Sequence, residues 1–271
     1  MTENQYYITG DNFKFCYQKT GSGDEVLLAF HGYGLDKTCF DQVGESELLK
    51  KYSIYSFDLF FHGNSTWDKF HKPVSNQVLS KILSDFLIQS NIVHFDLMAY
   101  SLGARFAFNL ILSNPEKINK LILIAPDGLS QSIWYNLATK TQLGRLIFKS
   151  LIIKYNFFPE LYSLLTKLSL LDSKTLKFAQ NQMKTKELRL KVYQSWICLR
   201  KLYPNTNQLF KTINKNEISI TLYWGKFDNV IPFKGIEKIK KSVLKLDFIE
   251  LNCGHTNIID YLSKHNLKSI K

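Results

Sequence analysis

Short apolar runs that alternate with helical patterns constrain the fold of this chain more than any other feature of its sequence. Two stretches with apolar residues at helical spacing lie near residues 77–89 and 102–113, and the second ends at Asn114-Pro115. The apolar runs with which they alternate are nearly continuous, as expected of strands covered on both faces. They are Val26 to Phe30, Ser53 to Asp58, Phe95 to Tyr100 and Leu121 to Ala125. The alternation predicts an α/β fold with a mostly parallel central sheet flanked by helices.

The same pattern extends toward both ends of the chain and is interrupted once. Tyr6 to Thr9 and Phe13 to Gln18 are predicted to form a hairpin. Over residues 128–212, Leu, Lys, Phe and Tyr recur at helical spacing with no convincing strand. Strands and helices then resume at Ile218 to Trp224, Phe233 to Lys241, Phe248 to Leu251 and Thr256 to Ser263. We predict one domain, with a core of residues 1–127 and 213–271 and an inserted helical cap of residues 128–212.

The cysteines and the apolar runs constrain the environment of the protein. The four cysteines form no Cys-x-x-Cys pair, so the sequence indicates neither a disulfide framework nor a zinc site. No apolar stretch approaches the roughly 18 uncharged residues that a membrane-spanning helix needs. The first residues lack the basic-then-apolar pattern of a secretory signal. We expect a soluble, cytoplasmic protein without a metal or an integral membrane segment, whose cysteines are buried: Cys16, Cys39, Cys198 and Cys253.

Ser101 lies where a predicted buried strand turns directly into a predicted helix. Small residues stand two positions to either side of it, Ala99 and Gly103, so the pentapeptide reads A-x-S-x-G. A sharp strand-to-helix turn holds its central serine in an uncommon backbone conformation and brings the two elements close together, which requires small flanking residues. A serine at the start of a helix can also be an ordinary N-cap. The strand before it and the small neighbours favour a nucleophile.

A serine nucleophile needs a base to take its proton and a carboxylate to orient that base. Asp228 and His255 each follow a late predicted strand, so both lie on loops at the edge of the sheet where Ser101 lies. Each alone could be a capping or turn residue, but their joint placement predicts a triad with Ser101. Asp127, just after an earlier strand, is the alternative acid. Three other histidines lack such a setting and are expected at the surface or in structural roles: His71, His94 and His265.

Acyl transfer also needs donors for the negative charge that develops on the carbonyl oxygen. The glycine-rich stretch 31–34, His-Gly-Tyr-Gly, follows a predicted strand and can bring a backbone amide toward the serine. The backbone N–H groups of Tyr33 and Leu102 are the predicted oxyanion hole. His31 and Gly32 are expected to shape the loop rather than to react.

Five motifs in this order resemble the α/β-hydrolase superfamily over almost the whole chain. They are His31-Gly32-Tyr33-Gly34, Asp58-Leu59-Phe60-Phe61-His62-Gly63-Asn64-Ser65, the Ser101 pentapeptide, Trp224-Gly225-Lys226-Phe227-Asp228 and Gly254-His255. The order Ser, Asp, His along the chain is also the order of that superfamily. Within it, the chain looks most like small capped serine carboxylesterases, including the pimeloyl-carrier-protein methyl ester esterases of biotin synthesis. The resemblance implies an α/β-hydrolase fold, a cap between the sixth and seventh strands of the core sheet, and hydrolysis through an acyl-enzyme without a cofactor.

Three positions depart from the pattern of that family. Phe60-Phe61 stands where relatives usually carry Pro-Gly, and Ala99 replaces a glycine. Thr256-Asn257 follows the histidine where relatives often place an apolar residue and proline. The first and third departures affect the expected wall and rim of the pocket.

Basic side chains are concentrated in one segment. Lysine and arginine exceed aspartate and glutamate by 35 − 23 = 12 over the chain, and residues 128–217 carry 15 basic and 4 acidic side chains, a net +11. We interpret this segment as a lysine-rich, solvated helical face. Docking of an anionic partner, such as an acyl carrier protein, a coenzyme A thioester or an anionic lipid surface, is the alternative. No nucleic-acid-binding module is recognisable, so we expect no nucleic-acid partner.

The predicted function is hydrolysis of a small-molecule carboxylic ester through an acyl-enzyme. Among enzymes, the alternative is a thioesterase or a carrier-protein ester hydrolase guided by the basic segment. Outside enzymes, the alternative is a catalytically silent binding protein that uses the same pocket.

Overall fold

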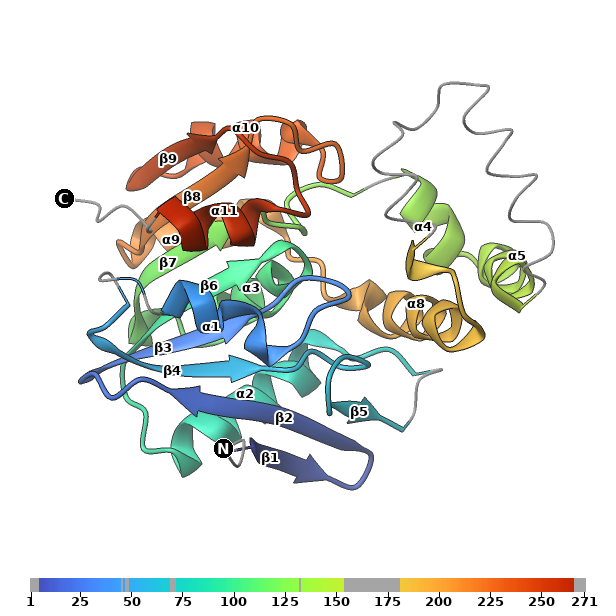
Figure 1. The fold of residues 1–271 in the computed structure, drawn as a ribbon, viewed down its shortest axis with the longest axis horizontal. Helices are drawn as coiled ribbons and strands as arrows, with labels where there is room; N and C mark the ends of the chain where they lie inside the picture. The colour runs from blue at the N-terminus through green and yellow to red at the C-terminus, as the bar shows by residue number, and fades with distance from the viewer. Residues whose placement is uncertain are drawn as a thin grey trace. The chain divides into compact units, whose positions relative to one another are not determined.

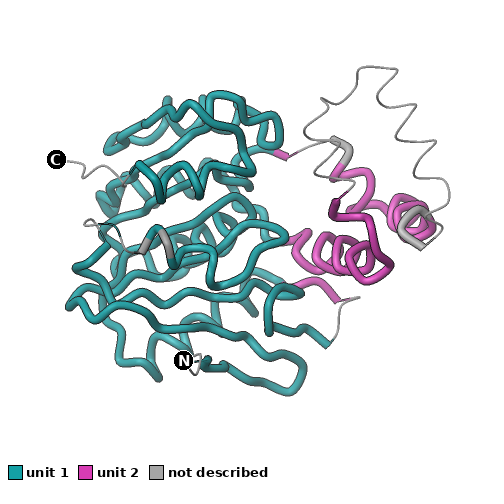
Figure 2. Tube along the Cα trace, in the orientation of Figure 1, with its two compact units in different colours: residues 1–68, 75–130, 202–271 teal, residues 69–74, 131–201 magenta. Residues whose placement is uncertain are grey.

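The computed structural model describes residues 5–44, 46, 49–68, 72–131, 133–153 and 181–265 (Figure 1). The chain divides into two compact units, which Figure 2 colours separately. Unit 1 consists of residues 1–68, 75–130 and 202–271, and unit 2 of residues 69–74 and 131–201.

Unit 1 is built on a nine-stranded sheet in which the strands run in the order β1-β2-β4-β3-β6-β7-β8-β9, with β5 paired to β2 (Figure 1). The pairs β1–β2, β2–β4 and β2–β5 are antiparallel, and all neighbours from β4 to β9 in that order are parallel. The mostly parallel sheet predicted from the sequence is therefore confirmed. The strands are β1 Gln5–Gly10, β2 Phe13–Thr20, β3 Glu25–Phe30, β4 Tyr52–Phe57, β5 Thr66–Trp67, β6 Phe95–Tyr100, β7 Ile118–Ile124, β8 Ser219–Gly225 and β9 Leu246–Leu251.

Helices flank this sheet on both faces. The helices α2, α3 and α9 pack together on one face, and α1 packs against α11 on the other (Figure 1). The α-helices of unit 1 are α1 Asp41–Gly44, α2 Asn76–Gln89, α3 Ala104–Ser113, α9 Thr206–Lys215, α10 Phe233–Ser242 and α11 Ile258–His265. Short 3₁₀ helices occur in the same unit at η1 Lys37–Phe40, η2 Ser101–Gly103 and η3 Pro115–Lys117.

Burial explains why the apolar runs form the centre of the sheet. All six residues of β6 are buried, because β3 and β7 lie on its two edges and helices cover its faces. Full burial of one large apolar side chain contributes about 1.5–3 kcal/mol. Helix α2 shows the matching helical pattern, since its buried residues recur every three or four positions and Ser75 caps its first turn by accepting a hydrogen bond from the N–H of Val78.

Unit 2 contains α4 Ile133–Lys140, α5 Gln142–Ile153, α8 Lys186–Cys198 and the 3₁₀ helix η5 Leu199–Lys201. Helix α5 packs against both α4 and α8. A Cβ atom on Gly144 would lie 1.8 Å from the carbonyl oxygen of Leu137, so only glycine permits the close approach of α5 to α4. On the other side, the ring of Phe148 contacts the rings of Tyr193 and Trp196 on α8.

The predicted cap, residues 128–212, includes residues 154–180, which lie outside the described residues, and the cap stays a prediction. The longer segment of unit 2, residues 131–201, lies inside that range, and unit 2 also includes residues 69–74. None of the helices in the described part of the chain combines the length and apolarity that crossing a membrane requires. All four cysteines are free thiols; Cys16, Cys198 and Cys253 are buried as expected, whereas Cys39 is half-buried.

Candidate functional site

Ser101 occupies a sharp turn between β6 and α3. Its φ of +48° lies in the left-handed region, which a residue with a side chain adopts only under strain. Two residues on, a Cβ atom on Gly103 would lie 2.1 Å from the carbonyl oxygen of Phe30 and 2.7 Å from that of His31. The turn therefore packs directly onto the end of β3, and position 103 has room for glycine alone.

The side chains of Ser101, His255 and Asp228 form one hydrogen-bonded chain. The Oγ atom of Ser101 lies 2.9 Å from Nε2 of His255, and Nδ1 of His255 lies 2.6 Å from Oδ2 of Asp228. The other carboxylate oxygen of Asp228 accepts hydrogen bonds from the N–H groups of Val230 (2.8 Å) and Ile231 (3.0 Å). These two amides fix the carboxylate with one oxygen facing the imidazole. All three side chains are buried and follow the carboxyl ends of the parallel strands β6, β8 and β9.

Tyr100 contacts both the main chain and the ring of His255, and this interaction was not predicted from the sequence. Its hydroxyl donates a 2.8 Å hydrogen bond to the carbonyl oxygen of His255, and the two rings lie 5.4 Å apart. Burial, together with the nearby Asp228 carboxylate, raises the pKa of the Tyr100 hydroxyl well above its usual range. The hydroxyl therefore remains a neutral donor. The only sequence signal for this role was its position immediately before Ser101.

The loop after β3 passes beside the serine. A Cβ atom on Gly32 would lie 2.7 Å from the ring of Tyr100 and 3.3 Å from the Cβ of Ser101. The ring of His31 contacts main-chain atoms on both sides, with Nδ1 2.7 Å from the carbonyl oxygen of Gly32 and Nε2 accepting the N–H of Leu59 at 3.0 Å. The amide of Tyr33 lies on this loop, and that of Leu102 follows the serine directly; their role as donors stays a prediction.

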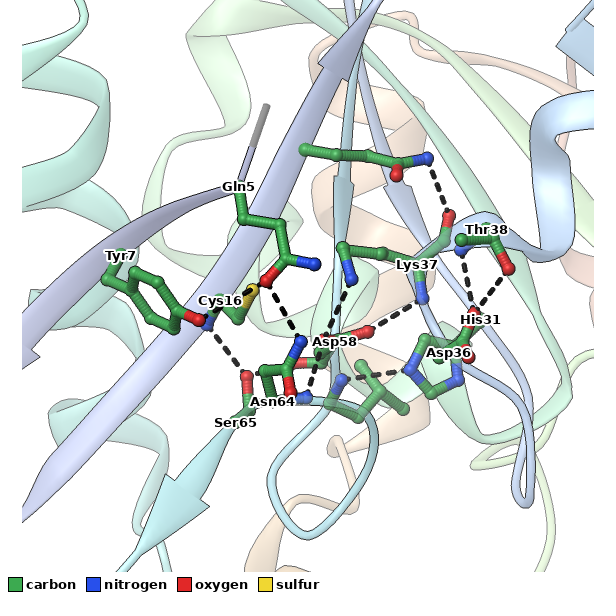
Figure 3. A network of polar contacts seen from close by, with 12 residues as sticks. Gln5, Tyr7, Cys16, His31, Asp36, Lys37, Thr38, Asp58, Asn64 and Ser65 are labelled. Atoms are coloured by element: carbon green, nitrogen blue, oxygen red, sulfur yellow. Dashed lines mark hydrogen bonds and ion pairs between the residues drawn. The ribbon is translucent and has the colours of Figure 1, made fainter. Parts of the chain in front are cut away.

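A buried polar network ties the loop after β3 to the loop after β4 (Figure 3). Its centre is the fully buried carboxylate of Asp58, which accepts hydrogen bonds from the N–H groups of Lys37 (2.7 Å) and Asn64 (2.8 Å). The ammonium of Lys37, also buried, lies 3.7 Å from the same carboxylate. The hydroxyl of Ser65 donates to the carbonyl oxygen of Asp58 and accepts the N–H of Cys16, both at 2.8 Å. Asp58 thus joins three separate segments of the chain.

Two departures from the family pattern have local explanations. Phe61 has a φ of +65°, so it adopts the left-handed conformation that glycine takes without strain. Asn257, which stands in place of proline, accepts the N–H of Gly254 at 2.9 Å through its side chain and closes the loop before His255. The loop before His255 is therefore closed without the usual proline, whereas Phe61 takes the conformation of the usual glycine at the cost of backbone strain.

Asp127, the alternative acid, pairs with a different partner. Its Oδ2 accepts hydrogen bonds from Nε (2.9 Å) and Nη2 (2.5 Å) of Arg105, whose guanidinium lies 3.8 Å from the ring centre of Tyr203. The N–H of Asp127 also donates to the carbonyl oxygen of Ser101 at 2.9 Å. The carboxylate that contacts His255 is that of Asp228. The sequence analysis assigned no role to Arg105, although it is the one charged residue of α3.

Other candidate sites lie elsewhere. Within the described residues, no group of three or more His, Cys, Asp or Glu side chains could hold a metal ion. A cavity of about 450 Å³ is lined by the beginnings of β8 and β9 and by Lys120 near the beginning of β7, at the opposite edge of the sheet from Ser101. His94 and His265 are exposed, and His71 lies outside the described residues.

Comparison with known protein sequences shows that the chain matches a family model and is distantly similar to several curated proteins. A family model described as the alpha/beta hydrolase fold matches residues 25–261. An uncharacterised protein of Mycobacterium tuberculosis is 26% identical over 127 residues, which cover 47% of this chain and 36% of that protein. The chain spans about a third of the length of the curated relatives that it matches.

Solved structures resemble the chain over nearly its whole length. The thioesterase domain from the curacin biosynthetic pathway is 16% identical with a TM-score of 0.62, covering 96% of this chain and 97% of that one. A carboxylesterase of the ammonia-oxidising thaumarchaeon Nitrososphaera gargenis is 16% identical with a TM-score of 0.66, covering 94% and 93%. At such identities the likeness concerns the fold.

Proposed function

Because the chain belongs to the alpha/beta hydrolase fold family, we propose that it is a hydrolase and that it cleaves a small-molecule carboxylic ester through a covalent acyl-serine intermediate. One observation carries the proposal: the hydrogen-bonded chain from Ser101 through His255 to Asp228, with distances of 2.9 and 2.6 Å. These separations are within the range needed for proton transfer to a general base and for orienting that base.

In the proposed reaction, Oγ of Ser101 attacks the ester carbonyl while Nε2 of His255 takes its proton. Asp228 accepts the N–H at Nδ1, which keeps the imidazole in the tautomer that leaves Nε2 free, and then stabilises the imidazolium. The imidazolium gives its proton to the leaving alcohol, and an acyl-enzyme remains. A water molecule, deprotonated by His255, then releases the acid and restores the serine.

The negative charge on the tetrahedral intermediate needs donors close to Ser101. The amide of Leu102 is adjacent in the chain, and the close approach of Gly32 to Ser101 supports the neighbouring amide of Tyr33 as the second donor. The contacts of His31 with the main chain of Gly32 and Leu59 support a role in holding this loop.

Labelling with a fluorophosphonate tests the proposal. The full chain should be labelled and should hydrolyse p-nitrophenyl esters, whereas Ser101→Ala should lose both properties while keeping its circular dichroism spectrum. Ser113→Ala, at the exposed C-terminal end of α3, the helix that follows Ser101, is the matched control and should be labelled normally. An unlabelled but folded wild-type chain would point to a silent binding protein, and labelling that persists in Ser101→Ala would refute the choice of nucleophile.

A thioester or a carrier-protein ester is the second candidate substrate. The net +11 charge of residues 128–217 supports it, because acyl carriers and coenzyme A are anionic. Rates on acyl-coenzyme A and on p-nitrophenyl esters of the same acyl chain separate the two candidates. A higher kcat/KM for the thioester that falls steeply with added salt would favour the second.

A further inference from the structure

Helix α5 carries apolar side chains on a side other than the one that packs against α4 and α8. Its packing side is marked by Phe148, which contacts α8, and by Gly144, which contacts α4. Leu143, Leu146 and Ile147 stand at the spacing i, i+3, i+4, so they form one stripe on another side of the helix. With Leu137 of α4 they are between 50% and 68% exposed. We call these four residues the apolar stripe.

Such a stripe requires an explanation. Single exposed apolar side chains are normal on soluble proteins, but a contiguous group marks an interaction site. The four residues lie within a segment of only eleven positions, 137–147, on two helices that pack against each other.

The charged side chains of the segment that carries the apolar stripe are all of one sign. Residues 131–153 contain Lys140, Arg145 and Lys149 and no acidic residue. Lys149 is exposed and lies one helical turn after Leu146, so it borders the stripe. Lys140 donates to the side chain of Gln131, and Arg145 donates to the carbonyl oxygens of Thr139 and Lys140. These acceptors are neutral, so within the described residues neither cation is paired with a carboxylate.

We propose that the apolar stripe and its basic border dock unit 2 onto an anionic lipid surface. Helices of this composition lie in the plane of the lipid–water interface, with aliphatic side chains among the acyl chains and lysines reaching the headgroups. Docking there is independent of the proposed hydrolysis, and it would present the protein to amphiphilic esters dispersed in the same surface.

Two other occupants fit the chemistry less well. A second copy of this chain would bring the basic borders of both stripes together, which like charges oppose. A protein partner would be expected to engage Trp, Tyr and Arg anchors, whereas the exposed residues here are Leu and Ile.

Vesicle co-sedimentation with the full chain tests the proposal. The protein should bind vesicles of phosphatidylcholine and phosphatidylglycerol in equal parts, and should bind pure phosphatidylcholine at least tenfold more weakly. Lys140→Gln with Lys149→Gln should weaken binding about thirtyfold, since each cation near an anionic surface is worth about 1 kcal/mol. Replacing Leu143, Leu146 and Ile147 together by Gln should weaken it at least tenfold.

Two controls distinguish binding through the apolar stripe from nonspecific hydrophobic binding and from any effect of catalysis. Ile88→Gln with Val93→Gln and Leu244→Gln removes three apolar side chains of unit 1 that are 66–83% exposed, and binding should be unchanged. Ser101→Ala should also bind normally, so loss of esterase activity and loss of docking are scored independently.

Three results would overturn the proposal. The first is equal affinity for both vesicle compositions, and the second is an equal loss of binding in the stripe variant and in the unit 1 control. The third is self-association in sedimentation velocity that disappears in the stripe variant, which would identify a second copy as the occupant.

Discussion

Replacing Lys37 by methionine tests whether the buried pair with Asp58 holds the loop after β3. Methionine keeps most of the apolar stem and removes the ammonium, which lies 3.7 Å from Oδ2 of Asp58. The carboxylate would keep its hydrogen bonds from the main-chain N–H groups of residues 37 and 64. It would lose the positive charge that faces it in a site with no exposure to water.

The magnitude follows from the separation and the burial. Two unit charges 3.7 Å apart attract each other by about 4.5 kcal/mol at an effective dielectric constant of about 20. Removing one partner of a buried pair costs about 3–5 kcal/mol, because the remaining charge is left uncompensated. The two retained main-chain hydrogen bonds favour the lower end, so we expect the free energy of unfolding to fall by about 3 kcal/mol.

Urea denaturation at pH 7, followed by tryptophan fluorescence, measures this change. Lys51→Met is the matched control, because Lys51 pairs with Glu25 at 2.6 Å on the exposed surface, where such a pair contributes under about 1 kcal/mol. Combining Lys37→Met with Asp58→Asn should recover part of the loss, since the uncompensated charge is then gone. A loss in Lys37→Met no larger than in Lys51→Met would refute the reasoning.

Three other substitutions have defined outcomes. Asp228→Asn should lower kcat about 10⁴-fold with the fold intact, because an amide cannot hold His255 in the required tautomer. Steady-state kinetics measure this change, and a fall of less than tenfold would contradict the prediction. Gly103→Ala should cost more than about 3 kcal/mol, because its Cβ would lie 2.1 Å from the carbonyl oxygen of Phe30, and a wild-type Tm would contradict it. Burial raises the pKa of Asp96, so the folded state favours its neutral form and stability falls as pH rises through the ordinary carboxyl range. Asp96→Asn should flatten this slope and raise the free energy of unfolding at pH 7. Parallel stability curves for variant and wild type from pH 4 to 8 would argue against it.

The central strands could be predicted because their sequences are apolar on both faces. Strand β6 begins at Phe95 and ends at Tyr100, as predicted, and β3 begins one residue earlier than predicted, at Glu25. Elements too short to show any periodicity escaped prediction, among them the two-residue strand β5 and the four-residue helix α1.

The candidate site was accessible to prediction for a topological reason. Parallel strands bring their carboxyl ends to one edge, so residues that follow β6, β8 and β9 converge even though Ser101 and His255 are 154 positions apart. The pairs Lys37–Asp58 and Arg105–Asp127 were not predictable in this way. Each joins residues on two different loops or helices whose contact depends on how β3, β4, α3 and β7 pack, and no local pattern encodes that.

The chain leaves unit 1 after Ser130 and returns to it at Leu202, while the strands that carry Ser101, Asp228 and His255 all belong to unit 1. A different segment inserted between Ser130 and Leu202 would leave those strands and their register unchanged. Natural or laboratory selection can therefore vary residues 131–201 extensively while the hydrogen-bonded trio is inherited unchanged.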